Sequence, residues 1–335
     1  MAEKSVLAGD IGGTKTQLAV FSVRDGKLYP KDKQTFLSKQ FPGLEPVVQE
    51  FLTNRTDDFD SACFGIAGPV VKGQVKTPNL PWIVEAKKLA SMLQCGSISL
   101  LNDLEATAFG LFTLEPHEVL SLNDRAVTER PAHKALIAAG TGLGESILFD
   151  DGREYHPMAS EGGHGDFAPT NELEIGLLRD LMNRFGRVSY ERVVSGPGLL
   201  NVYNFLAASG TLREPDQVKE TIAAATDRSA VITQLALSGE SEVCAKALDL
   251  FVSVYGAEAG NLTLKAKATG GLYVGGGIAP KILSKLKDGT FMRAFLDKGR
   301  YGEFMAAIPV NVVLNAETAL QGAAYYAAFR SHGCS

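Results

Sequence analysis

The sequence predicts an α/β protein with mixed sheets and two domains. Short apolar runs that are typical of strands alternate along the chain with segments of helical periodicity. A pattern of strand, glycine turn and second strand recurs after roughly 130 residues, which indicates a weak internal repeat. With 335 residues and a hydrophobic content of 45%, the chain can fill two cores.

The expected strands are apolar runs without turn formers. They span residues 5–8, 17–23, 62–66, 97–101, 134–139, 145–149, 272–274 and 310–314.

Two helices are the clearest of those expected. The first covers residues 171–185, where Thr170 can cap the start and Gly186 can end the last turn. Its predicted apolar face consists of Ile175, Leu178, Leu181, Met182 and Phe185. The second covers residues 316–330 with Asn315 as its cap. Its small-residue stripe, which favours close packing on a sheet, consists of Ala319, Ala323 and Ala327.

No linker rich in proline or serine separates the halves, so the domain boundaries follow from the motifs. We expect a small α/β domain of residues 1–112 and 314–335 and a large α/β domain of residues 113–313. The last helix would then return to the first domain.

Composition excludes several classes of function. The net charge is −5 and no basic cluster with interleaved aromatics is present, which argues against nucleic-acid binding. The four cysteines are scattered without metal-ligand spacing, as expected for reduced thiols in a cytosol. The N-terminal apolar stretch is too short for a signal peptide, and no run approaches the roughly 20 residues of a membrane helix. We therefore expect a soluble, cytoplasmic protein.

The most informative segment is the glycine turn in residues 9–16. Strand-like runs lie on both sides, whereas a P-loop or a dinucleotide fingerprint needs a helix after its glycines. Gly12 and Gly13 can take positive φ and bring backbone N–H groups onto an anion, and Thr14 and Thr16 can add hydroxyl donors. The turn is thus a candidate phosphate-binding hairpin.

Asp10 in this turn would be repelled by phosphate unless a cation lay between them. Mg²⁺ is suited to that place, because it keeps several waters and takes only one or two carboxylates. An ordinary Gly-Gly hairpin with a surface aspartate remains an equal alternative for the segment by itself.

Two more glycine turns follow strand-like runs. Gly140-Thr141-Gly142-Leu143-Gly144 comes after residues 134–139, and Gly275-Gly276-Gly277 comes after residues 271–274, before a segment that could open a helix. Three such turns could surround one nucleotide.

Asn102 and Asp103 lie at the carboxyl end of an expected strand, where ligands gather in α/β folds. A carboxylate there can accept the proton of an attacking hydroxyl, and Asn102 could orient the same substrate. A helix N-cap pair is the structural alternative, which the two residues alone favour.

Residues 161–166 place three polar side chains among glycines, as in a binding loop. Glu161 can accept from two hydroxyls while His164 donates and accepts, which suits a polyhydroxylated substrate such as a sugar. Zinc with Asp166 as a third ligand, or a catalytic-base role for His164, are minority alternatives. For Glu191 the residues themselves favour a first-turn helix carboxylate.

Six segments together resemble the bacterial-type, ATP-dependent glucokinases. They are Asp10–Thr14, Pro78–Trp82, Leu101–Ala106, Gly140–Gly144, Glu161–His164 and Glu191–Gly198. The resemblance runs from about residue 5 to 325, and a set in this order, nearly end to end, is highly specific. It implies the two-domain actin/Hsp70/sugar-kinase (ribonuclease H-like) fold with an interdomain cleft, whose domains close over ATP and sugar.

The resemblance also implies roles for individual residues. Asp103 would take the proton from the 6-hydroxyl of glucose, and the sugar would be held by Asn102, Asp103, Glu161, His164 and Glu191. Nucleotide would be bound by Gly9, Asp10, Ile11, Gly12, Gly13, Thr14, Gly140, Thr141, Gly142, Gly144, Gly275, Gly276 and Gly277, with Mg²⁺ at Asp10, through water. A homodimer is a further expectation. No cysteine cluster follows His164, unlike the zinc-bearing sugar kinases and repressors of the same fold.

The function expected is transfer of the ATP γ-phosphoryl group to glucose. A kinase for another hexose or an N-acetylated amino sugar remains open, because the motifs do not fix tolerance at the sugar 2-position. A sensor without catalysis remains a remote alternative, since Asp103 is present and no helix-turn-helix extension is found.

Overall fold

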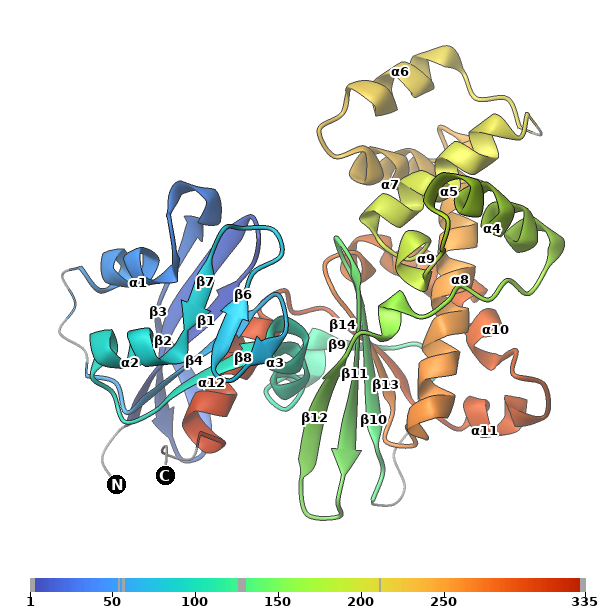
Figure 1. Ribbon diagram of the computed structural model, residues 1–335. Coiled ribbons are helices and arrows are strands. Elements are labelled where there is room, and N and C mark those ends of the chain that lie inside the picture. The colour runs from blue at the N-terminus through green and yellow to red at the C-terminus, as the bar shows by residue number, and fades with distance from the viewer. Residues whose placement is uncertain (1–3, 54, 56–57, 126–130, 211, 332–335) are drawn as a thin grey trace. The chain divides into compact units, whose positions relative to one another are not determined.

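The structure is a computed structural model that describes residues 4–53, 55, 58–125, 131–210 and 212–331. The chain divides into two compact units: unit 1 is Met1–Pro116 with Asn315–Ser335, and unit 2 is His117–Leu314. Each unit has a main β-sheet with helices packed on it (Figure 1), so the predicted α/β class is confirmed.

The main sheet of unit 1 has five strands and is mixed. The glycine turn joins β1 to its antiparallel partner β2, while β4 and β8 continue parallel to β1 on its other side. In spatial order the strands are β3 (Lys27–Leu37), β2 (Lys15–Arg24), β1 (Lys4–Ile11), β4 (Ser61–Ile66) and β8 (Ile98–Asn102). A small separate sheet contains β5 (Val70–Val71), β6 (Gln74–Lys76) and β7 (Ile83–Glu85).

Both faces of the unit 1 sheet are covered, because alternate residues of a strand point to opposite sides. Leu7 of β1 belongs to one core together with the helices α1 (Leu44–Leu52) and α2 (Ala86–Leu93). Val6 belongs to the other core, with α3 (Asp103–Gly110) and α12 (Thr318–Phe329).

The last helix, α12, packs on β1, β4 and α3, as its small-residue stripe predicted. A Cβ at Gly322 would lie 1.8 Å from the Ala106 carbonyl oxygen, so only glycine permits this approach. The helix begins at Thr318, two residues later than expected, and Asn315 instead accepts a bond from the Glu317 amide at 2.7 Å. In the stripe, Ala323 and Ala327 are buried but Ala319 only partly so.

The main sheet of unit 2 repeats the strand order of unit 1. β10 has an antiparallel partner, β11, on one side and a parallel partner, β13, on the other, which confirms the internal repeat. In spatial order the strands are β12 (Tyr155–Ser160), β11 (Leu143–Asp150), β10 (Lys134–Ala139), β13 (Leu272–Gly275), β14 (Val310–Val313) and β9 (Val119–Ser121).

A long central helix, α8, fills the core of unit 2 and packs against β10 and β13 (Figure 1). The Tyr255 hydroxyl on α8 lies 3.3 Å from the Ala139 amide, at the end of β10. The helices of unit 2 are α4 (Glu172–Phe185), α5 (Gly196–Ala208), α6 (Asp216–Ala224), α7 (Arg228–Ser238), α8 (Glu242–Ala266), α9 (Leu283–Lys287), α10 (Thr290–Leu296) and α11 (Gly302–Ala306). The short 3-10 turns are η1 (Ser38–Gln40), η2 (Pro116–Glu118), η3 (Gly162–His164), η4 (Tyr190–Arg192), η5 (Ala279–Ile282) and η6 (Gly299–Tyr301).

Helix α4 starts and ends where expected but differs in cap and face. Asn171, not Thr170, caps it by accepting from the Glu174 amide at 3.1 Å. Thr170 instead donates to the Glu174 carboxylate, which draws this carboxylate inward. The buried positions are Glu174, Leu177 and Leu181. Two residues of the predicted apolar face, Met182 and Phe185, are exposed, so that part of the prediction was wrong.

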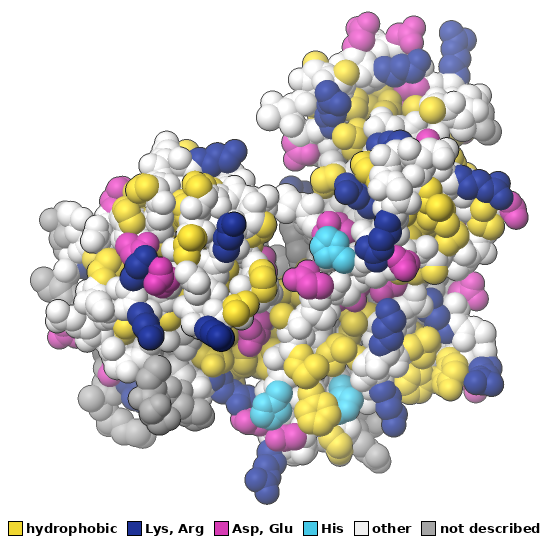
Figure 2. Space-filling view, viewed as in Figure 1, with side chains coloured by type: hydrophobic (Ala, Val, Ile, Leu, Met, Phe, Trp, Pro, Cys, Tyr) yellow, Lys and Arg dark blue, Asp and Glu magenta, His cyan; other side chains and the backbone are white. Residues whose placement is uncertain are grey.

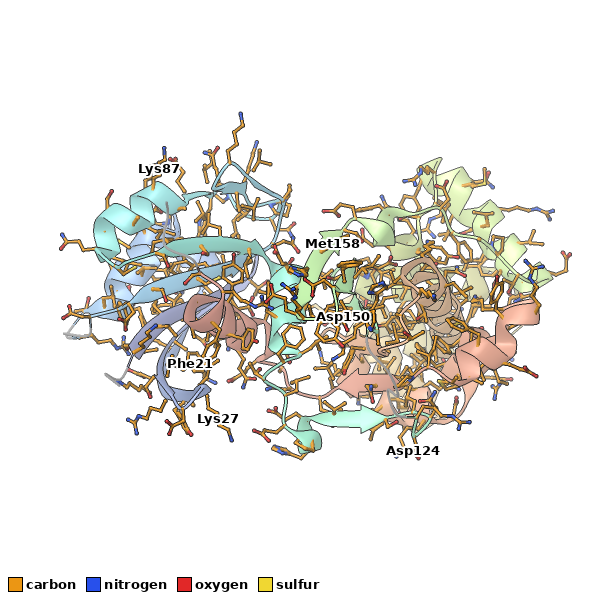
Figure 3. All side chains as sticks on the ribbon, turned by 90° about the horizontal axis from the view of Figure 1, so that it is seen from below. Phe21, Lys27, Lys87, Asp124, Asp150 and Met158 are labelled. Carbon is orange, nitrogen blue, oxygen red and sulfur yellow. The ribbon has the colours of Figure 1, made fainter. Side chains whose placement is uncertain are left out.

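The remaining surface carries mixed charge. Figure 2 shows acidic and basic side chains interspersed over the visible faces, with apolar side chains between them. Among the exposed apolar residues is Met158 of the edge strand β12, which is labelled in Figure 3. Cys63, Cys95 and Cys244 are free thiols, and Cys334 lies outside the described residues. Within the described ranges, no helix is long and apolar enough to span a membrane.

Candidate functional site

The first glycine turn links β1 to β2 and is fastened by one serine. The Gly12 amide donates to the Lys15 carbonyl at 2.9 Å, which closes the turn. Ser38 donates its hydroxyl to the Gly12 carbonyl at 2.8 Å and its amide to the Thr14 carbonyl at 3.0 Å. The backbone of the turn is therefore held in one conformation before any ligand arrives.

Two expectations for this turn were wrong. Neither Gly12 nor Gly13 is among the described residues with positive φ. Gly13 is needed for space, since a Cβ there would lie 2.9 Å from the Asn79 Cβ. Thr16 cannot offer its hydroxyl to a ligand, because it is fully buried and lies 3.0 Å from the Ser38 hydroxyl. Thr14 is exposed.

Gly9, Asp10 and Ile11 belong to strand β1 rather than to the turn. A Cβ at Gly9 would lie 2.6 Å from the Phe64 ring, so its small size serves the sheet packing. Ile11 is buried in the core beneath. Asp10 is thus the last polar side chain of β1 before the turn.

Two carboxylates meet at the strand ends of unit 1. Burial, with the Asp103 carboxylate nearby, raises the pKa of Asp10 to about 6. A divalent cation beside Asp10 would relieve both causes, so Asp10 suits an ion of the Mg²⁺ type. No cluster of three or more His, Cys, Asp or Glu side chains that could hold a metal occurs in the described part of the chain. Mg²⁺ in nucleotide sites typically needs only one or two protein carboxylates.

Asn102 ends β8 and caps α3, so the structural alternative for this pair is realised. Its Oδ1 accepts from the Leu104 amide at 2.9 Å, and its Nδ2 donates to the Gly68 carbonyl at 3.2 Å. Asp103 also accepts from the Leu104 amide at 2.9 Å, which fixes the direction of its carboxylate. Capping and substrate binding do not exclude each other, because a carboxylate has several acceptor positions.

The second and third glycine turns lie together at one edge of the unit 2 sheet. Gly140 and Gly142 form a turn closed by a 2.9 Å bond from the Gly140 amide to the Gly142 carbonyl, and Gly144 already belongs to β11. Gly276, with φ of +82°, follows the strand residue Gly275. Its Cβ would lie 2.3 Å from the carbonyl oxygen of Ala139, so the two turns touch through backbone alone.

The residues beside these turns are accessible. Thr141 and Gly277 are exposed, and no atom lies within 4 Å of a Cβ placed at Gly277. The expected helix after Gly277 begins as the 3-10 turn η5 and continues as α9.

Three of the predicted sugar ligands form a cluster in unit 2. His164 lies between two carboxylates, with Nε2 4.0 Å from Glu161 Oε2 and Nδ1 4.0 Å from Glu191 Oε1. The side chains of Glu161 and His164 are 74% and 54% exposed, so a ligand can reach them. Such a group of two acceptors and a donor or acceptor suits adjacent hydroxyls.

The start of β11 supports this cluster, a feature that was not predicted from the sequence. The Leu143 amide donates to Glu191 Oε2 at 2.9 Å. Gly163 packs on the Leu143 carbonyl, where a Cβ would come within 2.0 Å. The second glycine turn and the sugar cluster therefore share one piece of backbone.

Arg187 also supports the cluster. It donates to the His164 carbonyl at 2.6 Å and pairs with Asp166 at 2.7 Å. Asp166, the conceivable third zinc ligand, is thus engaged by a cation. The sequence did not identify Arg187 as a supporting residue, because no motif spacing distinguishes this arginine.

The comparisons with known proteins come from sequence and from structure. The family model described as Glucokinase matches residues 7–330. The chain belongs to the glucokinase family. A relative named glucokinase from Nostoc sp. is 42% identical over 339 residues, which cover 96% of this chain and 98% of the relative.

Solved glucokinases share the fold. The glucokinase from an Antarctic psychrotroph superposes with a TM-score of 0.84 at 30% identity and covers 97% of this chain and 99% of its own. A glucokinase of the ROK family from Streptomyces griseus, in complex with glucose and AMPPNP, has a TM-score of 0.65 at 20% identity, with 98% and 99% covered. The two-domain actin/Hsp70/sugar-kinase fold predicted from the resemblance is confirmed.

Proposed function

We propose that this chain transfers the γ-phosphoryl group of ATP to the 6-hydroxyl of glucose and releases glucose 6-phosphate and ADP. The observation that carries the proposal is the full-length membership of the glucokinase family, together with the Glu161, His164 and Glu191 cluster. Transfer is direct, since in-line displacement needs no covalent enzyme intermediate.

Asp103 acts as the general base in this proposal. Its carboxylate accepts the proton of the 6-hydroxyl as the oxygen attacks phosphorus. Support comes from its place at the carboxyl end of β8 and from its bond to the Leu104 amide, which fixes the acceptor. Asn102 orients the same hydroxyl region of the sugar from the adjacent position.

Glu161, His164 and Glu191 hold the remaining sugar hydroxyls. Glu191 is fixed by the Leu143 amide through one oxygen, which leaves Oε1 for a hydroxyl. Glu161 is the most exposed of the three, and we expect the sugar to order the 161–166 loop. Protease sensitivity at Gly162 that sugar leaves unchanged would count against this ordering.

ATP binds at the glycine turns. The turns at Gly12–Thr14 and Gly140–Gly142 hold the phosphates, and Gly275–Gly277 lies near adenosine. The Streptomyces griseus neighbour was solved with an ATP analogue, which supports this nucleotide. Asp10 would hold Mg²⁺ through water, and the ion would supply charge neutralisation for the phosphates.

The remaining parts of the proposal concern the whole molecule. Residues 1–112 with 314–335, and residues 113–313, act as a small and a large domain. The enzyme works as a homodimer in the cytoplasm. Light scattering of the purified chain tests the dimer, since a mass near that of one chain would contradict it.

The test of function is ADP release with Mg-ATP and a panel of sugars. Glucose, fructose, mannose, N-acetylmannosamine and no sugar are compared at equal concentration. Release that depends on glucose supports the proposal. Activity with a different sugar alone would reassign the substrate, and silence with every sugar would leave only a sensor.

A further inference from the structure

A second pair of carboxyl groups lies beneath the sugar cluster and has no part in the mechanism above. Glu145 of β11 is 1% exposed and Glu258 of α8 is 0% exposed. The two side chains lie within hydrogen-bond reach of each other. Two carboxylates this close in a buried site cannot both stay ionised, so the pair holds a proton.

The proton belongs on Glu145. When Glu145 is ionised it can only accept, and its buried Oε1 then has no hydrogen-bond partner among the described residues. A proton on Glu145 turns it into a donor toward Glu258 and removes this unsatisfied atom. Burial, with the Glu258 carboxylate next to it, raises the pKa of Glu145 to about 8.

Glu258 is suited to be the acceptor of the pair, because its other partners are donors. Asn261 donates to its Oε2 at 2.9 Å, and Lys265 lies 3.5 Å from its Oε1. Lys298 also faces Glu258, and Tyr190 and Tyr255 are the other titratable groups near the pair. Lys265 acts against the protonation of Glu145.

The pair touches both segments that carry the sugar ligands. A Cβ at Gly162 would lie 2.0 Å from Glu145 Oε2, so the loop backbone rests directly on this carboxyl group. Ser160 at the start of the loop donates to the Glu145 carbonyl at 3.0 Å. On the other side, Asn261 also lies 3.1 Å from the hydroxyl of Tyr190, the neighbour of Glu191.

We propose that Glu145 is a positioning residue for the sugar: while protonated it bonds to Glu258 and holds the 161–164 loop in place, and its ionisation releases that loop. The proton is lost to solvent. A second buried negative charge under Gly162 demands hydration, which the packed loop excludes. The inference rests on the proposed function, because it concerns the binding of its sugar.

The test is the pH dependence of KM and kcat for glucose over roughly pH 6.5 to 9.5, the span over which such a group titrates. In the wild type, KM rises through about pH 8 while kcat changes less, because loop order affects binding first. If sugar binding raises the pKa of Glu145 by one unit, the rise in KM is about tenfold. Glu145→Gln imitates the protonated acid, so its KM stays flat and close to the neutral wild-type value.

Two lysine variants supply a second, independent test. Lys265→Met removes the cation that opposes protonation, so the KM transition moves to higher pH. The side chain of Lys265 is 64% exposed, and this variant is expected to fold even if Glu145→Gln does not. Lys246→Met, an exposed lysine on the same helix, is the matched control and leaves the transition in place.

A spectroscopic readout does not depend on activity. The infrared band of a buried carboxylic acid should be present at pH 7, fade through about pH 8 and be absent in Glu145→Gln. An alkaline rise in KM that is equal in wild type and Glu145→Gln, or unmoved in Lys265→Met, overturns the proposal. A wild type without glucose-dependent turnover would refute the proposed function instead, while the band would still report the shared proton.

The same proton affects stability. The pKa of Glu145 is raised in the folded state above its ordinary value of 4.5. Its favourable contribution is therefore complete below about pH 4.5 and is lost as the pH rises through about 8. Relative to Glu145→Gln, the wild type loses unfolding free energy across this window, and parallel stability profiles would contradict the assignment of the proton.

Discussion

The main sheets of the two units share one strand order but differ at the strand ends. In unit 1, Asp10 is paired with Gln17 of β2 and Gly65 of β4. In unit 2 the same place in the sheet is taken by Ala138, between a glycine on β11 and a glycine on β13. At this position unit 1 thus supplies a carboxylate, whereas unit 2 supplies backbone between glycines. The same scaffold can serve two kinds of chemistry.

The turns are also fastened differently. A serine side chain holds the first turn, through the 2.8 Å bond from Ser38 to the Gly12 carbonyl. Backbone holds the second, where the Gly196 amide donates to the Gly140 carbonyl at 2.8 Å. A side-chain fastening can be removed by one substitution, but a backbone fastening can be disturbed only by adding atoms.

The largest effect is expected when the charge of Asp103 in unit 1 is removed. Asp103→Asn should lose on the order of 10² or more in kcat, since general-base catalysis contributes this much. Glucose binding should persist, because the Asn102 cap and the start of α3 do not need the charge. Steady-state kinetics and calorimetry measure the two quantities, and retained turnover would remove Asp103 from the role of base.

The next largest effect is expected from a side chain added where the two glycine turns of unit 2 touch through backbone. Gly276→Ala adds a Cβ at φ of +82° against the Ala139 carbonyl, so we expect a loss of roughly 3 kcal/mol in the free energy of unfolding. Gly277→Ala is the control for stability, because its Cβ meets open space. Equal denaturant midpoints for both variants would show that the contact between the two turns is not needed.

The smallest effect is expected when the Ser38 hydroxyl, which holds the first turn, is removed. Ser38→Ala leaves the buried Thr16 hydroxyl and the Gly12 carbonyl without their partner, at a cost of about 1.5 kcal/mol. The exposed Ser91→Ala, whose hydroxyl bonds only within its own helix, should stay within about 0.5 kcal/mol of wild type. A Ser38→Ala protein as stable as Ser91→Ala would mean that the turn holds itself.

Much of the fold could be predicted because its signals are local. The apolar runs of β1, β4 and β10 are strands in the structure, and the helix after Asn102 begins where the sequence changes character. The polar edge strand β3 was not predicted, because a strand that faces water need not be apolar. Helix α8 was not delimited, since it is buried on most sides and so lacks a polar stripe to give periodicity.

The candidate site divides in the same way. Residue types and motifs identified Asp103, His164 and Glu191, although the roles of these residues remain predictions. The supports could not be identified, because they join residues far apart in the chain. The Leu143 amide meets Glu191, and Glu145 meets Glu258, only after β11, η4 and α8 have packed. A buried carboxyl group in a strand has no sequence signal for the partner that keeps it protonated.

The position of α12 in the sequence affects how the protein folds during its synthesis. α12 packs on one face of β1 and β4, strands that are synthesised before unit 2, whereas α12 itself is synthesised after unit 2. During synthesis, Val6 and its neighbours lack their contacts with α12 while all of unit 2 is translated. The sheet of unit 2 can therefore fold on the ribosome before the sheet of unit 1 is complete. A chain truncated before α12 would expose apolar surface of unit 1, which chaperones would recognise.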